Sequence, residues 1–306
     1  MVLIKLLTAC ILYACIPMLA LCSAPVLPST NADLDARVQT LLTKVKRSLR
    51  PLKAGTFEMG DWGDQFGRHY DMETSSRPLH KVTLDGFSMM AYKVTYDDFD
   101  LFTDVTGNQR IRSTGRYLKD RAPNRPAGVS WYGAKAYCQW LGALTKLPFD
   151  LPTEAQWEYA ARSGGKKVLF ATNNGKIERG HNFPKEWHGD EKEPNLIDVG
   201  TYPPNPAGLY GMSEETGEWV KDWFDQNYYS VSPEKNPLGP ENGTEKVQRG
   251  SGGGAAELSA AVFMRTKMIP QPLTTSFPNG IAGNQVMVPF PGYSGHKEDN
   301  FRCVVK

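Results

Sequence analysis

The sequence predicts an α+β fold built from short strands, a few helices and long irregular loops. Of its 306 residues, 40% are hydrophobic and 11% aromatic, which is enough for a substantial core. The 29 glycines and 22 prolines are typical of a loop-rich chain. Capped helix patterns and short strand-like runs are separated by long stretches without periodicity. The length is compatible with one large domain or two small ones.

Residues 1–22 are predicted to be a signal peptide. Lys5 precedes an apolar stretch, residues 6–21, which has the length of a signal-peptide core and is short for a membrane span. Cys22 follows as in a bacterial lipoprotein box, although Leu21 stands where a small residue is expected. We favour simple cleavage near Cys22 over lipidation or an uncleaved anchor. In each case we expect export to the bacterial periplasm, with membrane attachment only through a lipidated Cys22 or a retained signal.

Residues 23–51 are predicted to be a linker followed by an amphipathic helix. The first part is polar and rich in proline, and residues 33–50 carry apolar side chains at helical spacing. The apolar stripe consists of Leu34, Val38, Leu41, Leu42, Val45 and Leu49. We expect this helix to pack onto the main domain, residues 52–306. A spacer or partner-binding helix is the alternative.

Three further helices are predicted inside the main domain. The first is capped by Thr95 with Asp98 and ends at Gly107. Ser130 precedes the second, and a capping box that starts at Thr153 precedes the third. Short strands are predicted at residues 56–59, 80–84, 247–249 and 301–305. Two irregular segments, residues 164–206 and 226–245, are expected to be functional surfaces or to be bound by something.

Charge and side-chain patterns argue against several function classes. The formal net charge is +2 with acidic and basic residues interspersed, so no nucleic-acid footprint is visible. The five histidines include no pair at metal-ligand spacing on a helix, and no Gly-x-Ser-x-Gly nucleophile elbow occurs. The glycine-rich run at residues 250–254 lacks the Gly-Lys-Ser/Thr ending of a phosphate loop. Its glycines are expected where the backbone bends or lies close to a neighbour.

Seven motifs occur in an order that is found in one known family. The most distinctive is residues 151–162, Leu-Pro-Thr-Glu-Ala-Gln-Trp-Glu-Tyr-Ala-Ala-Arg. The others are residues 55–60, 77–95, 126–141, 203–212, 218–219 and 301–304. Together they resemble the formylglycine-generating enzymes, the sulfatase-modifying oxidases, from about Leu52 to the C-terminus. The resemblance implies the C-type-lectin-like fold of that family.

The two catalytic cysteines of that family have no counterpart in this chain. In the family, an Arg/Lys-Gly-Gly-Ser run leads into two cysteines five residues apart, and the segment from Arg249 onward resembles that run. Without a gap, the cysteine positions are occupied by Ala255 and Ala260. Soft sulfur ligands hold Cu(I) and a thiolate engages the substrate cysteine, and a methyl group can do neither. We therefore expect neither the formylglycine-generating activity nor copper.

A single disulfide is predicted between Cys138 and Cys303. The other cysteines, Cys10, Cys15 and Cys22, lie in the signal segment. Two cysteines in an exported domain predict one bond, and the family resemblance implies the same pairing. The bond would close a loop of about 165 residues and stabilise the fold by roughly 4–5 kcal/mol in the chain-entropy model.

A structural calcium site is left open by the resemblance. Family members read Met-x-Gly-Asn-x-Trp-Glu-Trp, with the asparagine at a calcium site, and Glu215 takes that place here. Asn195 matches the start of a second calcium loop, which looks shortened in this chain. Carboxylate and amide oxygens are good calcium ligands, so both residues are candidates. The alternative is that the site is lost and that Glu214 and Glu215 are solvated.

The candidate binding surface lies beside the glycine-rich strand, which forms the floor of the substrate cleft in the family. The candidate residues are Arg249, Ser251, Gly253, Glu257, Trp219, Tyr228 and Tyr229. Trp187 and the aromatic residues within 289–293 are further candidates, because exposed aromatics are enriched at interface hot spots. Packing of these aromatics against the core is the alternative. Arg249 and Arg302 match family arginines and are expected to pair with buried carboxylates.

Two functional hypotheses follow. The first is an exported, non-catalytic protein that binds another protein. Exported relatives of this kind include regulators of a membrane Ser/Thr kinase that controls type VI secretion, and this chain resembles them. The partner would be a periplasmic protein or the ectodomain of a membrane protein. The second is an enzyme with non-cysteine chemistry, in which Glu257 could be a general base; relatives without the cysteine pair help to oxidise a siderophore chromophore.

Overall fold

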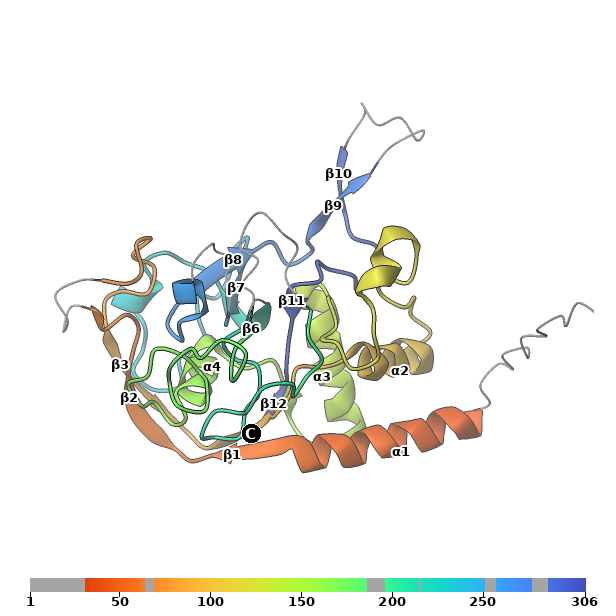
Figure 1. The fold of residues 1–306 in the computed structure, drawn as a ribbon, viewed down its shortest axis with the longest axis horizontal. Helices are drawn as coiled ribbons and strands as arrows, with labels where there is room; N and C mark the ends of the chain where they lie inside the picture. Colours follow the sequence, from red (N-terminus) through yellow and green to blue (C-terminus); the bar gives the residue numbers. More distant parts are fainter. Residues whose placement is uncertain (1–30, 64–68, 186–195, 215, 251–256, 277–285) are drawn as a thin grey trace, which may run out of the picture.

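A computed structural model describes all residues except 1–30, 64–68, 186–195, 215, 251–256 and 277–285. The described chain is a mixed fold of short strands and a few helices linked by long loops (Figure 1). None of its described helices has the length and apolar character needed to span a membrane. Four helices and two four-stranded sheets form the body of the described part.

The first sheet joins the beginning and the end of the described chain. Its strand order is β1–β4–β12–β5, and the neighbouring strands are antiparallel. These strands are β1 (Leu49–Leu52), β4 (Phe87–Met90), β5 (Phe149–Asp150) and β12 (Val304–Val305). Because β4 pairs with both β1 and β12, the two ends of the domain are held in one sheet.

The second sheet carries the strand that resembles the family's active-site strand. Its order is β11–β6–β7–β8. The strands are β6 (Gly217–Trp223), β7 (Lys246–Arg249), β8 (Arg265–Met268) and β11 (Asp299–Asn300). All four residues of β7 are buried, since β7 lies between β6 and β8.

Two antiparallel pairs complete the described strands. One consists of β2 (Gly55–Met59) and β3 (His80–Leu84), and the other of β9 (Leu273–Ser276) and β10 (Val286–Pro289). The β9–β10 pair stands away from the body of the molecule, above the sheets in Figure 1. We call this pair the arm.

The predicted helix caps are confirmed. Thr95 and Asp98 form a reciprocal capping box on α2 (Tyr96–Thr106), which ends at the left-handed Gly107. The Ser130 side chain accepts from the Gly133 amide at the start of α3 (Trp131–Thr145). Thr153 and Gln156 cap α4 (Glu154–Ala161) in the same reciprocal way. Such caps satisfy backbone amides that would otherwise lack partners.

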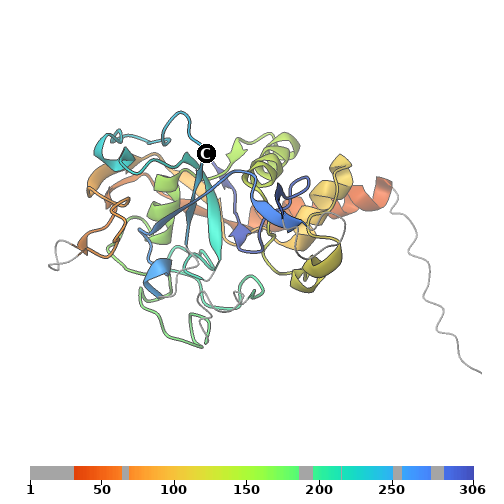
Figure 2. The ribbon, with the colours of Figure 1, turned by 90° about the horizontal axis from the view of Figure 1, so that it is seen from above.

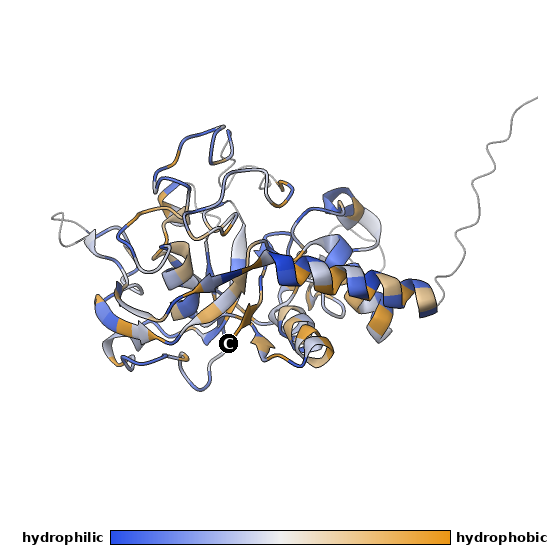
Figure 3. Ribbon diagram, turned by 90° about the horizontal axis from the view of Figure 1, so that it is seen from below, coloured by the Kyte–Doolittle hydropathy of each residue, from blue (hydrophilic) through white to orange (hydrophobic). Residues whose placement is uncertain are grey.

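Helix α1 (Asn31–Ser48) packs onto the domain, as the sequence predicted. Its buried Val38, Leu41 and Val45 join the same apolar core as residues of α2 and α3. Figure 3 shows the alternation of hydrophobic and hydrophilic positions along this helix. The helix continues directly into β1, which pairs with β4.

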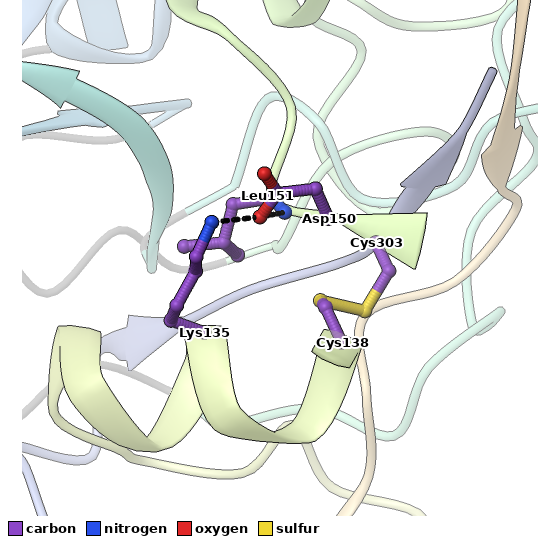
Figure 4. Close-up of a disulfide and its surroundings, with 5 residues drawn as sticks. All are labelled: Lys135, Cys138, Asp150, Leu151 and Cys303. Carbon is purple, nitrogen blue, oxygen red and sulfur yellow. Dashed lines mark hydrogen bonds and ion pairs between the residues drawn. A yellow bond between two sulfur atoms is a disulfide. The ribbon is translucent and has the colours of Figure 1, made fainter. Parts of the chain in front are cut away.

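The predicted disulfide is confirmed. Cys138 on α3 is bonded to Cys303, which precedes β12, with 5.7 Å between the Cα atoms. The bond lies beside the ion pair of Lys135 with Asp150, as Figure 4 shows. Both cysteines are fully buried. The disulfide therefore connects the helical layer to the first sheet.

The strand predictions were correct in part. Strands β2, β3 and β7 are where the sequence placed them, whereas the predicted strand at residues 301–305 is limited to β12. The sequence did not predict β6, β8 or the arm. These strands have no clear alternation in exposure, because β6 is buried on nearly every position and β9 is half-buried on all. The period-2 signal of a half-exposed strand is absent in such cases.

Candidate functional site

Strand β7 leads directly into Gly250, the first residue of the glycine-rich run. Gly250, which follows Arg249, has φ of 93°. A Cβ atom there would lie 2.9 Å from a ring carbon of Trp157 and 3.0 Å from the Met212 carbonyl oxygen. Glycine is required because both the backbone conformation and the space exclude a side chain. The predicted close approach is thus confirmed at Gly250, while Ser251, Gly253 and Ala255 lie outside the described residues.

Arg249 is held by two carboxylates of α4. Its guanidinium donates to Glu154 at 2.7 Å and to Glu158 at 2.7 Å, and all three side chains are buried. Arg162 also donates to Glu158, at 2.9 Å. Burial lowers the pKa of Arg249, but the neighbouring carboxylates of Glu158 and Glu154 more than offset this effect, so the pKa lies above its ordinary value. The predicted structural role of Arg249 is confirmed, and its side chain is not part of an accessible surface.

Arg265 on β8 extends the same network. Its guanidinium binds both oxygens of Glu154, at 2.7 and 3.0 Å. Burial raises the pKa of Glu154, and the charges of Arg265 and Arg249 more than offset this effect, so the carboxyl titrates below its ordinary value. Tyr229 donates its hydroxyl to Glu154 at 3.3 Å. We call Arg249, Arg265, Arg162, Glu154 and Glu158 the arginine–glutamate network.

Two candidate surface aromatics are corrected to core residues. Tyr229 is 2% exposed, and the guanidinium carbon of Arg265 lies 4.4 Å from the centre of the Tyr229 ring. Trp219 is fully buried, and its indole nitrogen donates to the Val129 carbonyl at 2.9 Å. Large aromatic side chains bury extensive apolar area, and each of these also has a partner for its polar atom. The sequence could not distinguish such packing from an exposed hot spot.

The other aromatic candidates are Tyr228, Trp187 and the aromatic residues within 289–293. Tyr228 is half-buried and accepts a hydrogen bond from the Gly239 amide at 3.1 Å, so its hydroxyl fastens the irregular segment 226–245. Tyr293 stacks on Phe102, with ring centres 5.8 Å apart. Trp187 lies outside the described residues. Packing of the loops onto the core therefore accounts for the described members of this set.

Ala260, at which the ungapped resemblance predicts the family's second cysteine, is enclosed by the protein. Ala260 ends the 3-10 helix η5 (Glu257–Ala260) and is fully buried. Its carbonyl accepts from the Ser213 hydroxyl at 2.8 Å, and that hydroxyl accepts from the Ala171 amide at 2.8 Å. Hydrogen bonds thus tie η5 to two loops. A methyl group at this position has no redox or nucleophilic chemistry.

Glu257 lies at the accessible edge of the same segment. Its carboxylate pairs with the guanidinium of Arg179 at 2.6 Å, and both side chains are about two-fifths exposed, 40% and 39%. The pair joins η5 to the loop that contains Asn182, whose amide donates to Asn173 at 2.8 Å. The ion pair of Glu257 with Arg179 therefore links η5 to this loop at the surface.

The calcium candidates Asn195 and Glu215 lie outside the described residues. Among the residues that are described, no group of three or more His, Cys, Asp or Glu side chains is placed to hold a metal ion. Next to Glu215, the buried ammonium of Lys93 donates to the Thr216 carbonyl at 3.0 Å, to its hydroxyl at 2.8 Å and to Glu214 at 3.3 Å. Glu214 is therefore not simply solvated. The oxygens on both sides of position 215 already surround a cation of the protein itself.

Arg302 forms the second buried pair expected from the sequence. Its guanidinium binds both oxygens of Glu218, at 2.7 and 2.8 Å, and donates to the carbonyls of Ala91 and Tyr210. The partners of Arg249 and Arg265 were not assigned from the sequence. Glu154 and Glu158 are four residues apart on one helix, and that spacing was the signal that could have identified them.

The fold and the network define a formylglycine-generating-enzyme-like protein without the catalytic thiols. The sequence model described as the sulfatase-modifying factor enzyme 1-like domain matches residues 42–276. The chain belongs to this family. The predicted fold class is confirmed by the structure of PvdO from Pseudomonas aeruginosa, which superimposes with a TM-score of 0.62 at 24% identity over 84% of this chain and 94% of that one.

Two curated relatives show the range of proteins that contain similar sequences. The formylglycine-generating enzyme of Mus musculus is 29% identical over 251 residues, 65% of this chain and 64% of that protein. The serine/threonine-protein kinase pkn1 of Chlamydia pneumoniae is 32% identical over 209 residues, 61% of this chain and 31% of that protein. The chain thus spans less than two thirds of the length of either relative.

Proposed function

We propose that this chain is an exported, non-catalytic member of the family that acts by binding another protein. The observation that carries this proposal is the combination of a retained scaffold with a missing thiol pair. The arginine–glutamate network and the disulfide hold the fold, while Ala255 and Ala260 occupy the cysteine positions. Cys138 and Cys303 are bonded to each other, and the remaining cysteines belong to the N-terminal 22 residues. No thiol of the domain is left for the family reaction.

The proposed partner is the periplasmic part of a membrane Ser/Thr kinase that controls type VI secretion. Similarity to part of a chlamydial protein named as a serine/threonine kinase supports a link between this domain and kinases. The apolar stretch at residues 6–21 supports export to the periplasm. The protein is proposed to need no copper, and a calcium ion at Glu215 or Asn195 would be structural.

In-cell cross-linking of the tagged full-length protein, followed by mass spectrometry, tests this function. We expect one dominant adduct with a membrane protein that has a periplasmic kinase-linked domain. The matched control is a tagged periplasmic protein of similar size expressed at the same level. The proposal is wrong if the same adducts appear with the control, or if no protein adduct forms.

An enzyme with non-cysteine chemistry has less support. Its candidate base, Glu257, is engaged by the guanidinium of Arg179 at 2.6 Å and links two loops on the surface. Oxidative maturation of a siderophore or of another small molecule would still require such a group. A Glu257→Gln variant that abolishes a cellular oxidation product while keeping the protein adduct would favour this alternative.

A further inference from the structure

A cavity of about 350 Å³ lies at the base of the arm. One wall is the segment that contains the 3-10 helix η2 (Gly115–Asp120), and the others are the arm and the turn before β11. Tyr117 of η2 is hydrogen-bonded to Thr274 of β9 at 2.6 Å, and its ring lies 5.7 Å from that of Phe290. Figure 2 shows the arm beside the η2 segment from above. The cavity is separate from the arginine–glutamate network, and β10 lies beyond the residues that match the family model.

The lining of this cavity is rich in positive charge. Its cationic side chains are Arg112, Arg116, Lys119 and Lys297. Its acidic side chains are Asp120 and Glu298, which leaves a net charge of two positive units from four cations and two acids. One of the acids, Asp120, is already paired with Arg112 at 2.5 Å. The cavity is therefore complementary to a negatively charged group.

Arg112 is built into the cavity wall. Its side chain is only 4% exposed, and its guanidinium also donates to the Gly295 carbonyl at 3.0 Å. The Nε of Arg112 is buried without a hydrogen-bond partner. Its guanidinium and that of Arg116 lie 4.7 and 5.1 Å from the ring centre of Tyr117. Arg112 is thus held by Asp120 and Gly295, and stacking on Tyr117 orders the exposed guanidinium of Arg116 for recognition of a carboxylate.

Strand β10 of the arm exposes apolar side chains next to this cavity. Met287, which lines the cavity, is 60% exposed, and Val286 is 43% exposed. Within the described residues, β9 and β10 pair only with each other. A two-stranded sheet is marginally stable in water, and exposed apolar side chains on it are typical of an interaction surface. A small anion would contact the cationic groups alone, whereas a polypeptide would also cover Val286 and Met287.

We infer that this cavity and the adjoining arm are the surface that docks the partner, through an acidic segment that also carries an apolar side chain. A carboxylate of that segment lies among the cationic side chains, and the apolar side chain packs on Met287. This inference rests on the proposed protein-binding function and assigns it to a surface separate from the arginine–glutamate network.

The first experiment places a photo-reactive benzoylphenylalanine at Leu118, which is 55% exposed on η2, in the full-length protein in its own cells. The matched control places it at Leu147, which is 47% exposed just beyond α3. We expect a partner adduct from position 118 and none from position 147. The cross-linked partner peptide should contain Asp or Glu beside an apolar residue. Adducts from position 147 alone, or a peptide without acidic residues, would overturn the inference.

The second experiment compares two charge reversals of equal size. Arg116→Glu with Lys119→Glu alters exposed cations of the cavity, and Lys176→Glu with Lys185→Glu alters exposed cations near the Glu257 surface. We expect the first pair to reduce partner capture at least tenfold and the second to leave it nearly unchanged. The reverse pattern would assign docking to the Glu257 surface, and capture that resists the first pair would show that the cations of the cavity do not hold the partner. Both results overturn the inference.

The two proposals fail in different ways. The in-cell cross-linking proposed above can be done with formaldehyde. If it captures a partner that the probe at Leu118 does not reach, this docking surface is wrong and the binding function stands. If formaldehyde captures no specific partner, the binding function itself is wrong. Because Leu118 is exposed, the probe is expected to leave the fold intact, so the result does not depend on the charge variants.

Discussion

Buried arginines determine how strand β7 is held. Arg249 and Arg265 share Glu154, while Glu158 is shared by Arg249 and Arg162. A buried ion pair gains little net stability when it is intact, because both partners are desolvated, but its disruption leaves a charge without compensation. The network is therefore costly to change one residue at a time.

Glu158→Gln should destabilise the fold strongly. The variant keeps the shape of the side chain but leaves Arg249 and Arg162 with less compensating charge, so we expect a loss of about 3–5 kcal/mol in unfolding free energy. Urea denaturation followed by circular dichroism measures it. The control is Glu58→Gln, which removes the exposed pair with Lys167 and should cost about 0–1 kcal/mol. Equal losses for the two variants would contradict the structural role of the network.

Asp222 should make stability depend on pH. Burial and the charge of Glu154 raise the pKa of Asp222 to about 7. A carboxyl with a raised folded pKa stabilises the fold below its unfolded pKa, and this contribution is lost as pH rises toward about 7. Relative to Asp222→Asn, the wild type should therefore lose about 2–3 kcal/mol between about pH 5 and about pH 8. The measurement is the free energy of unfolding of both proteins at the two pH values. If the difference between wild type and Asp222→Asn is the same at both, the predicted pH dependence is wrong.

At the scale of the element, α1 is a component of the core and not a spacer. Its buried face meets α2, and Lys44 of α1 binds Asp98, the capping residue of α2, at 2.7 Å. The helix continues into β1 without a linker. The capping of α2 and the packing of α1 thus depend on the same contact.

Leu41→Ala should show how much the packing of α1 stabilises the fold. Leu41 is 4% exposed, and removal of a buried leucine side chain typically costs about 2–4 kcal/mol through lost burial and a residual cavity. The control is Gln39→Ala, since Gln39 is exposed on the same helix and should change stability little. Denaturation of both variants is the measurement. If Leu41→Ala unfolds with the wild-type midpoint, α1 is not packed as described.

At the scale of the whole molecule, the disulfide and the first sheet tie distant segments together. The bond spans a sequence separation of 165 residues, from α3 to the segment before β12. β12 itself lies between β4 and β5. The C-terminal segment is therefore held by the disulfide and by strand pairing on both sides of β12.

Reduction of the Cys138–Cys303 disulfide should lower the free energy of unfolding by roughly 4–5 kcal/mol. The reason is that the loop it closes gains conformational freedom mainly in the unfolded chain. The measurement is denaturation with and without a reducing agent. The double variant Cys138→Ala with Cys303→Ala is the control, and its midpoint should not respond to the reducing agent. A wild-type midpoint that is equally insensitive would show that the bond contributes little.

The family motifs and local signals could be predicted from the sequence. Capping residues such as Thr95 and Thr153 act within one turn of their own helix, so their role is visible in the local sequence. The alanines at positions 255 and 260 and the limited number of cysteines are likewise properties of the sequence itself. From these features the family, the fold class and the absence of the thiol pair all follow.

Only the tertiary structure decided which candidate residues are accessible. Tyr229 and Trp219 looked like binding residues, but neighbours distant in the chain, Arg265 and Val129, enclose them. The cavity at the arm joins η2, β9 and the turn before β11, and no local pattern reports that three such segments meet. Burial and charge complementarity depend on contacts between distant residues. For that reason the sequence determined the family and the absence of the thiol pair, and the fold determined which side chains are buried and which are accessible.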